Sequence, residues 1–158
     1  MKTVFLDIDG VLDNEDTDFE LDERMIYRLS KIVHTTNSNI VLISSWKKFF
    51  YKRENNLMPY IKSESGVTLY NKLLDHDLYI TDKTDDSNTS RENSIINYIK
   101  ENNINNYVIL DDEDVLYKNK NLRKHLVLTT LNNKAIGLTD KNCEEAINIL
   151  NKEKIRSK

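Results

Sequence analysis

The first apolar run of the chain, residues 3–8, has apolar side chains at successive positions up to Asp7. Apolar and polar side chains do not alternate along it. A strand with one face in water alternates in this way, whereas a strand covered by helices on both faces is apolar throughout. The run therefore predicts the central strand of a parallel sheet. Because parallel sheets bind ligands beyond the carboxyl ends of their strands, Asp7 and Asp9 are the first candidates for a functional site.

Short apolar runs and longer segments of helical period alternate along the rest of the chain, which is the pattern of βα units. The expected strands are residues 3–8, 39–43, 78–80, 107–110 and 126–128. The expected helices are residues 22–33, 69–74, a helix that follows Ser90 and ends in the pair Asn102-Asn103, and residues 140–150, with a further helical stretch that follows Trp46 and runs to Pro59. This order predicts an α/β fold, with a Rossmann-like, mainly parallel sheet flanked by helices.

The composition bounds the number of domains and the kind of partner. Of the 158 residues only three are Gly and one is Pro, so the chain offers no flexible linker between domains. We expect one domain over residues 1–151 and a charged tail over residues 152–158. The 23 basic and 26 acidic residues give a formal charge of −3, which excludes a general attraction to nucleic acid and requires local recognition of any anionic partner.

Cysteine content and apolar runs bound the cellular setting. The single cysteine, Cys143, excludes an internal disulfide and a multi-cysteine metal site, and it fits a reducing compartment. The apolar runs, such as residues 40–43, are far shorter than the roughly 20 residues that cross a bilayer. Acidic residues also follow the amino terminus too closely for a signal peptide. We therefore expect a cytoplasmic protein without a membrane partner.

Polar side chains follow three of the expected strands at the point where each strand ends. They are Asp7 and Asp9 after the first strand, Ser44 and Ser45 after the second, and Asp111 and Asp112 after the strand at 107–110. Carboxylates that converge on one edge of a sheet repel one another unless a cation lies between them. A hard divalent cation with oxygen ligands resolves this conflict, and Mg²⁺ is the usual one where phosphate is also bound.

These residues resemble the motifs of the haloacid dehalogenase (HAD) superfamily of aspartate-nucleophile phosphohydrolases. The segment Asp7-Ile8-Asp9-Gly10-Val11 is similar to the first motif, and Ser44 to the second. Arg91, at the start of a helix, stands where the third motif has Lys or Arg, although Lys83 could reach the same place. The pair Asp111-Asp112 is similar to the fourth motif. The four elements occur in order over residues 3–140, nearly the whole chain.

The resemblance implies a role for each of these residues. Asp7 is implied as the nucleophile, Asp9 as the general acid and base, and Ser44 and Arg91 as catalytic residues that stabilise the phosphoryl oxygens. The implied phosphate-binding residues are Gly10, Ser44, Ser45, Lys47 and Arg91. The implied Mg²⁺ ligands are Asp7, Asp9, Asp111 and Asp112, and either Asp111 or Asp112 could be the direct ligand of the fourth motif.

A narrower resemblance is to the small capless HAD domains called Swiss-army-knife domains, which are associated with RNA repair. It is carried by residues 5–12, Ser44-Ser45-Trp46-Lys47, Arg91 with Ile95, residues 109–112 and Gly137-Leu138-Thr139. These domains commonly have Arg after the Trp, whereas this chain has Lys47, whose ammonium lacks the planar fork that contacts phosphate at two points.

The spacing of the motifs leaves no room for a large cap domain over the site. About 34 residues separate Asp9 from Ser44, and about 45 separate Ser45 from Arg91. An open site suits a phosphorylated substrate that is bulky or polymeric, such as a nucleic acid end, or a nucleotide. The implied function is a Mg²⁺-dependent phosphomonoester hydrolase that acts through an aspartyl-phosphate.

Two other functions and several structural interpretations stay open at this point. The domain could bind phosphate or nucleic acid without catalysis in a repair or regulatory assembly, although the presence of both Asp7 and Asp9 argues against this. It could also transfer phosphate to an acceptor other than water. Ser44 or Ser45 could cap the next helix, and Trp46 with Phe49 and Phe50 is more typical of the core than of a base-stacking platform. The basic residues between 118 and 124 are more typical of a solvated face.

Overall fold

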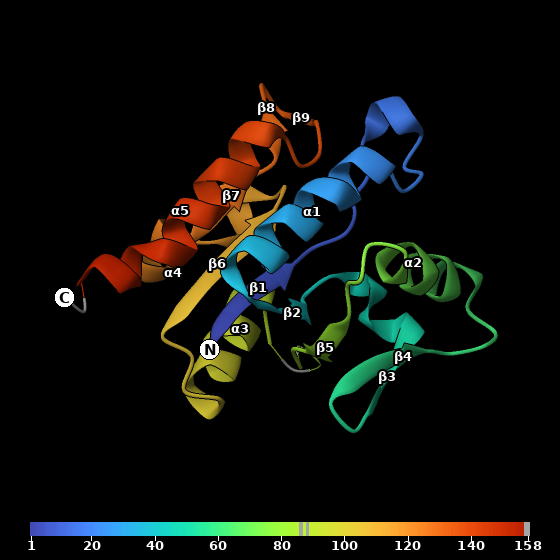
Figure 1. Cartoon of the computed structure of the whole chain (residues 1–158), viewed down its shortest axis with the longest axis horizontal. Helices are drawn as coiled ribbons and strands as arrows, with labels where there is room; N and C mark the ends of the chain where they lie inside the picture. The colour runs from blue at the N-terminus through green and yellow to red at the C-terminus, as the bar shows by residue number, and fades with distance from the viewer. Residues whose placement is uncertain (86, 88, 157–158) are drawn as a thin grey trace.

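The sheet of the protein contains five parallel strands in the order β5-β2-β1-β6-β7 (Figure 1). A computed structural model describes residues 1–85, 87 and 89–156, with side chains through residue 152. The strands are β1 (Lys2–Leu6), β2 (Asn39–Leu42), β5 (Ile80–Lys83), β6 (Asn106–Asp111) and β7 (Leu126–Leu128). The expected α/β class with a mainly parallel sheet is confirmed.

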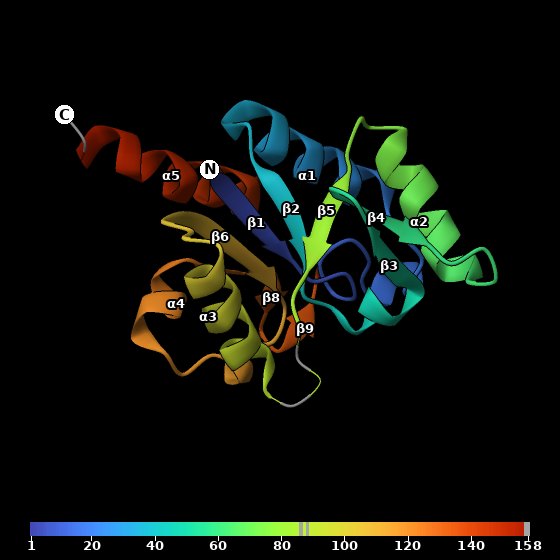
Figure 2. The ribbon, with the colours of Figure 1, turned by 90° about the horizontal axis from the view of Figure 1, so that it is seen from below.

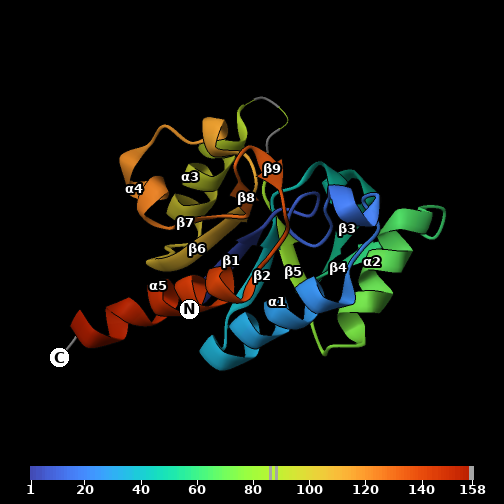
Figure 3. The same ribbon diagram turned by 90° about the horizontal axis from the view of Figure 1, so that it is seen from above.

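Helices cover both faces of the sheet, as the uninterrupted apolar run in β1 requires. Helices α1 (Glu23–Thr36) and α5 (Asp140–Arg156) lie on one face, and α3 (Arg91–Glu101) and α4 (Lys120–Lys124) lie on the other (Figures 2 and 3). Val4 and Leu6 of β1 pack on the α1 and α5 side, and Phe5 packs on the α3 side. Alternate residues of one strand therefore belong to two separate cores, each built of fully buried side chains.

Helix α1 shows how sequence signals fix an element. Asp22 is its N-cap, and the Asp22 carboxylate accepts a hydrogen bond from the backbone N–H of Arg24 at 2.8 Å. The apolar residues at helical spacing form the buried stripe, which comprises Met25, Ile26, Leu29, Ile32 and Val33. The helix runs to Thr36, three residues beyond the predicted end, because Asn37 closes it in the left-handed conformation.

The predicted helical stretch up to Pro59 is wrong. The chain forms a short 3-10 helix, η2 (Ser45–Phe49), and then an antiparallel hairpin of β3 (Phe50–Arg53) and β4 (Asn56–Pro59). The buried residues Phe50 and Leu57 are seven positions apart, a spacing that suits one helix face as well as two facing strands. The two-residue turn decides the outcome, with Glu54 in the left-handed region and Asn55 beside it.

The segment between residues 60 and 90 also differs from the prediction. Helix α2 (Glu64–Leu74) begins five residues earlier than expected, because the Ser63 side chain caps it by accepting from the Gly66 N–H at 3.1 Å. The predicted strand at 78–80 is displaced to β5, since the N–H of Leu78 still bonds to the carbonyl of Leu73 at 2.9 Å, at the end of the helix. The hairpin and α2 pack together beside β5 at the edge of the sheet (Figure 1).

Shorter elements occupy the loops at the carboxyl ends of the strands. They are the 3-10 helices η1 (Glu15–Thr17) and η3 (Asp114–Leu116) and the hairpin of β8 (Thr130–Leu131) and β9 (Lys134–Ala135). Within the described part of the chain no second domain lies over this edge, which confirms the expected absence of a large cap. No helix among those residues has the length and apolar character needed to cross a membrane.

The order of the strands places β1 where ligands bind in such sheets. The chain runs outward from β1 through β2 to β5 and then returns to the other side of β1 to form β6 and β7. The strand order therefore reverses between β1 and β6, and the crevice beyond this reversal is the usual ligand site. Leu6 of β1 pairs with Leu42 on one side and Leu110 on the other, so the residues that follow all three strands lie at one level.

Candidate active site

The carboxylates that follow β1 and β6 meet because their strands are in register. The N–H of Asp7 donates to the carbonyl of Leu110 at 3.0 Å, which sets Asp7 level with Asp111. The alternation of strand residues turns both side chains to the face of Phe5, toward α3. Asp7 is 5% exposed and Asp111 is fully buried.

Three carboxylates form a cluster at this edge of the sheet. Oxygens of Asp7, Asp111 and Asp112 all lie within 4.8 Å of one another. Burial, together with the charge of Asp111, raises the pKa of Asp7 to about 9, and burial raises the pKa of Asp112 to about 6. If all three carboxylates were ionised, their negative charge would exceed the positive charge that Arg91 supplies. Three carboxylate ligands at this spacing fit a hard divalent cation such as Mg²⁺.

Arg91 supplies positive charge to the cluster. It is the first residue of α3, which is capped by the Ser90 side chain, and its Nη1 lies 2.9 Å from Asp111 Oδ2 and 3.6 Å from Asp7 Oδ2. Although burial lowers the pKa of Arg91, the charges of Asp7 and Asp111 raise it above its usual range. The alternative residue, Lys83, donates instead to the backbone carbonyls of Lys47 at 3.2 Å and Phe50 at 2.8 Å. Arg91 rather than Lys83 therefore reaches the carboxylates.

Tyr117 is a member of the site that the sequence did not indicate. Its hydroxyl donates to Asp111 Oδ2 at 2.6 Å, and burial together with the charge of Asp111 raises the Tyr117 pKa above its usual range. The N–H of Glu113 donates to the other oxygen of Asp111 at 3.1 Å. With Arg91 included, Asp111 accepts hydrogen bonds from three protein donors. No feature of the sequence distinguishes this tyrosine from the other seven.

Gly10 makes the turn that follows β1. Its φ is +82°, in the left-handed region, and a Cβ at this position would overlap the carboxylate of Asp112. The N–H of Gly10 donates to Asp13 Oδ1 at 2.7 Å, and its carbonyl accepts from the Thr129 hydroxyl at 2.6 Å. Asp13 is fully buried, and this burial is the main cause that raises its pKa to about 8; the neighbouring Asp9 raises it further. Gly10 was predicted to bind phosphate, but its backbone N–H donates to Asp13 within the turn.

Asp9 lies apart from the three clustered carboxylates. Its side chain is exposed, and its Oδ2 accepts a hydrogen bond from the indole Nε1 of Trp46 at 3.0 Å. The sequence favoured a place in the core for Trp46. The ring does pack against the core, but its polar edge holds Asp9. The position of Trp46, two residues after the polar end of β2, is the signal that could have indicated this contact.

The remaining predicted phosphate-binding residues lie around η2. Ser44 is 1% exposed and caps η2, because its Oγ accepts from the N–H of Trp46 at 3.1 Å. Ser45 is exposed at the start of η2. Lys47 is buried, and its ammonium donates to the hydroxyl of Thr84 at 3.1 Å, in the loop after β5. Of this set, Ser44 stands level with the residues that follow Asp7, since the N–H of Ile43 donates to the carbonyl of Leu6.

The site thus has Asp-x-Asp after the central parallel strand, an acidic pair at the end of the neighbouring strand and an arginine that contacts both, which is the order of motifs expected of a HAD domain. A family model described as the HAD domain in Swiss Army Knife RNA repair proteins matches residues 3–143. The chain belongs to that family, so the resemblance seen in the motifs is confirmed. Neither the curated proteins nor the solved structures include a significant match to the chain.

Proposed function

We propose that this protein is a Mg²⁺-dependent phosphomonoester hydrolase in which Asp7 is the nucleophile. The observation that carries the proposal is the position of Asp7. It is buried at the end of the central strand, 3.6 Å from the guanidinium of Arg91 and within the carboxylate cluster. A carboxylate placed in this way can attack a phosphoryl group whose charge is offset by its neighbours.

The first step forms a bond between a carboxylate oxygen of Asp7 and phosphorus, while the bond from phosphorus to the leaving oxygen breaks. Arg91 stabilises the charge on the equatorial phosphoryl oxygens, and the hydroxyl of Ser44 is the proposed second donor. Asp111 keeps Arg91 in place through their hydrogen bond of 2.9 Å. The product of this step is an aspartyl-phosphate, which divides hydrolysis into two easier reactions.

Asp9 moves the proton in both steps. It gives a proton to the leaving oxygen and later takes one from the water that attacks phosphorus and releases Asp7. The hydrogen bond from Trp46 fixes the orientation of this carboxylate on the exposed side of the site. A carboxylate with access to water suits a group that must exchange its proton in each turnover.

Asp7, Asp111 and Asp112 would hold the cation. When bound, Mg²⁺ supplies positive charge that favours the ionised form of Asp7 and offsets charge on the phosphoryl group. Asp111 already accepts hydrogen bonds from Arg91, Tyr117 and the N–H of Glu113, so its orientation is set before a cation binds. Asp9, the fourth predicted ligand, is outside this group of three carboxylates, and its Oδ2 accepts a hydrogen bond from Trp46.

The proposed substrates are nucleotides or phosphorylated nucleic acid ends. The family description refers to RNA repair, and the described residues leave the site open to a bulky substrate. A phosphate-binding domain without catalysis is the alternative. The burial of Asp7 beside Arg91 favours the enzyme, because a domain that only bound anions would gain nothing from an additional buried carboxylate.

Phosphate release tests the proposal directly. We expect Mg²⁺-dependent release of phosphate from an activated aryl phosphate, lost in EDTA and in Asp7→Asn, because an amide does not attack phosphorus. Asp77→Asn is the matched control, since Asp77 is exposed in the turn before β5, away from the cluster. Activity that survives in Asp7→Asn would remove Asp7 as the nucleophile.

Thermal unfolding with a phosphoryl mimic separates the enzyme from a binding domain. Beryllium fluoride forms its complex on an aspartate oxygen, so it should stabilise the wild type in Mg²⁺ and leave Asp7→Asn unchanged. At about 100 times its Kd a ligand stabilises by roughly 2.7 kcal/mol. For a chain of this size that corresponds to a rise in Tm of roughly 5 to 10 °C. A binding domain would respond to phosphate or sulfate alone.

A further inference from the structure

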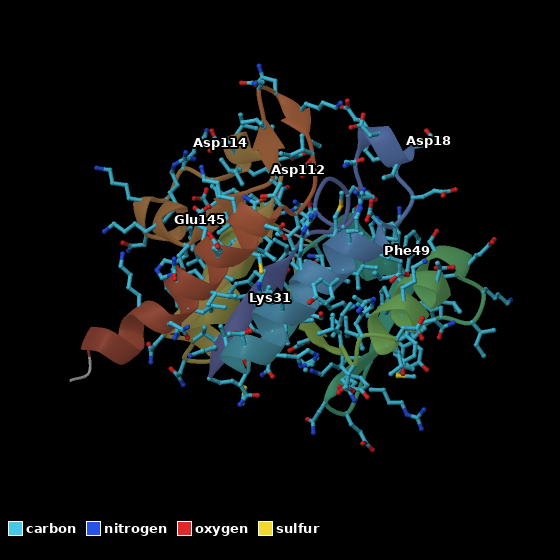
Figure 4. All side chains as sticks on the ribbon, turned by 45° about the horizontal axis from the view of Figure 1, so that its top comes forward. Asp18, Lys31, Phe49, Asp112, Asp114 and Glu145 are labelled. Carbon is cyan, nitrogen blue, oxygen red and sulfur yellow. The ribbon has the colours of Figure 1, made fainter. Side chains whose placement is uncertain are left out.

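A cleft of about 290 Å³ lies between the loop before α1, the helix η2 and α2. Its apolar walls come from Phe19, Leu21 and Trp46, and its polar groups include Glu20, Ser65 and Thr68. Small-molecule pockets usually measure roughly 300 to 1,000 Å³. This cleft therefore suits one planar ring system with polar groups at its edge. Figure 4 shows Asp18 of the same loop and Asp112 of the cluster, both in the upper part of the view.

Phe19 is held at this cleft in an unfavourable conformation. Its side chain is 51% exposed, and its φ is +58°, which a bulky residue rarely adopts. The loop is nevertheless well bonded. Asn14 accepts hydrogen bonds from the N–H of Thr17 at 3.0 Å through its side chain, and from the N–H of Phe19 at 3.0 Å through its carbonyl. An exposed aromatic ring that the fold fixes at the cost of backbone strain indicates a contact with a molecule outside the chain.

Trp46 connects the cleft to the proposed chemistry. The indole lines the cleft, and its Nε1 donates to Asp9 Oδ2 at 3.0 Å. Asp9 is the group that would give a proton to the leaving oxygen, so the leaving group must extend past Asp9. Trp46 is thus shared between Asp9 and the cleft, whereas Arg91 and the clustered carboxylates would hold the phosphoryl group.

We propose that this cleft is the subsite for the nucleobase of the leaving nucleotide, which stacks on Phe19 and Trp46. The inference rests on the proposed hydrolase and assigns the place where the base of its nucleotide or nucleic acid substrate binds. Base stacking on aromatic rings tolerates every base, because each base has a π-face. Glu20, Ser65 and Thr68 offer acceptors and hydroxyls to the polar edge of the base.

The charges around the cleft favour a neutral ring over a second phosphate. Glu20 contributes a carboxylate to the cleft, and the ammonium of Lys72 at its rim lies 3.1 Å from the carboxylate of Glu23. The anionic part of the substrate is thereby directed to Arg91, and the uncharged base to the cleft.

The single tryptophan of the chain gives a direct test of binding, because all indole fluorescence comes from Trp46. Adenosine 5′-phosphate and ribose 5-phosphate are titrated in Mg²⁺ into Asp7→Asn, which cannot consume them. We expect the nucleotide to quench the emission and to bind about 5- to 150-fold more tightly than the sugar phosphate, the range that stacking on one base supplies. Inorganic phosphate should leave the emission unchanged.

Variants of the cleft show whether the preference depends on these residues. Phe19→Ala should remove most of the preference for the nucleotide, and Phe19→Tyr should retain it because an aromatic ring remains. Thr68→Phe, at an exposed position of α2, should fill the cleft and abolish the preference without altering the core. The control is Tyr79→Ala, an exposed tyrosine in a separate cleft beside the end of α1 and the start of β2, which should leave the preference unchanged.

The two proposals fail in different ways. Equal affinities for the nucleotide and the sugar phosphate, with unchanged Trp46 emission, would overturn the base subsite even if the protein releases phosphate. Quenching that depends on the base and on Phe19 supports the subsite even in a chain that releases no phosphate, and that result would reject the hydrolase alone.

Discussion

The two halves of the candidate active site differ in their access to water. In the half under α3, Asp7 and Asp111 are buried and Arg91 bridges them. In the other half, Asp9 is exposed and a single tryptophan orients it. Electrostatic interactions are stronger where water is excluded, so in the proposed reaction the enclosed half suits the phosphoryl group. The open half suits the leaving group, which differs from one substrate to another.

The largest effect is expected in the open half. Asp9→Asn should lower kcat by roughly 10²- to 10⁴-fold for a nucleoside monophosphate, because the alkoxide then leaves without a proton. The loss should be much smaller for an activated aryl phosphate, whose leaving group needs no proton. Steady-state rates on both substrates measure the difference. An equal loss on the two would show that Asp9 does not move the proton.

Arg91→Ala tests the enclosed half. Removal of one donor to a developing charge costs roughly 10²- to 10³-fold in rate, and we expect a loss of that size in kcat/KM on every substrate, whatever its leaving group. Lys83→Ala is the matched control, because its ammonium bonds to backbone carbonyls of η2 and β3 rather than to carboxylates. A greater loss in the lysine variant would reverse the assignment of the two residues.

Trp46→Phe should have a moderate effect that sharpens the comparison. The phenyl ring keeps a stacking surface, but the hydrogen bond to Asp9 is lost, which for a charged acceptor with access to water corresponds to roughly 10-fold. We therefore expect kcat to fall by about this factor while KM for a nucleotide is nearly retained. A change confined to KM would mean that Trp46 acts through substrate binding alone.

The stability of the protein without a cation should depend on pH through the enclosed half. The pKa of Asp7 rises from 3.8 to about 9 on folding and that of Asp112 from 3.8 to about 6, so the folded state binds protons that the unfolded state has released. Their stabilising effect is complete below pH 3.8 and is lost as the pH rises toward 9. In EDTA, Tm should therefore decline from pH 5 to pH 9.

Two controls accompany this measurement. Asp7→Asn should show a weaker decline in Tm, because it lacks the group with the highest pKa. Mg²⁺ should raise Tm most at high pH, where its ligands ionise at the smallest cost. A Tm in EDTA that increases toward pH 9 would contradict the expected protonation of the cluster.

The sequence was sufficient to predict the parallel sheet, the helices on its two faces and the edge where Asp7 and Asp111 meet. The unbroken apolar run before Asp7 required helices on both faces, and the parallel register then brought Asp7 and Asp111 to one level. The hairpin after η2 was not predictable in this way. Its two buried residues, Phe50 and Leu57, have a spacing that helices share, and only the conformation of Glu54 separates the two outcomes.

The contacts between side chains were beyond the sequence for a different reason. Nothing in the order of residues states that the Trp46 indole turns its N–H to Asp9, or that Tyr117 donates to Asp111. Both contacts depend on how η2 and the loop before α4 return to the sheet. The choice of Arg91 over Lys83 was also open until the helix that begins with Arg91 was placed over the carboxylates.

The turn at Gly10 limits how a chain of this kind can evolve. Any other L-residue there would press its Cβ into the carboxylate of Asp112 on a backbone that already has a φ of +82°. A smaller residue at position 112 would make space but would remove a carboxylate from the cluster. A change at position 10 is therefore strained by the space that Asp112 fills, and a change at position 112 alters the carboxylate cluster. Under the proposed function, substitutions at Phe19 and on α2, which line the cleft, can alter substrate preference while Gly10 and Asp112 stay unchanged.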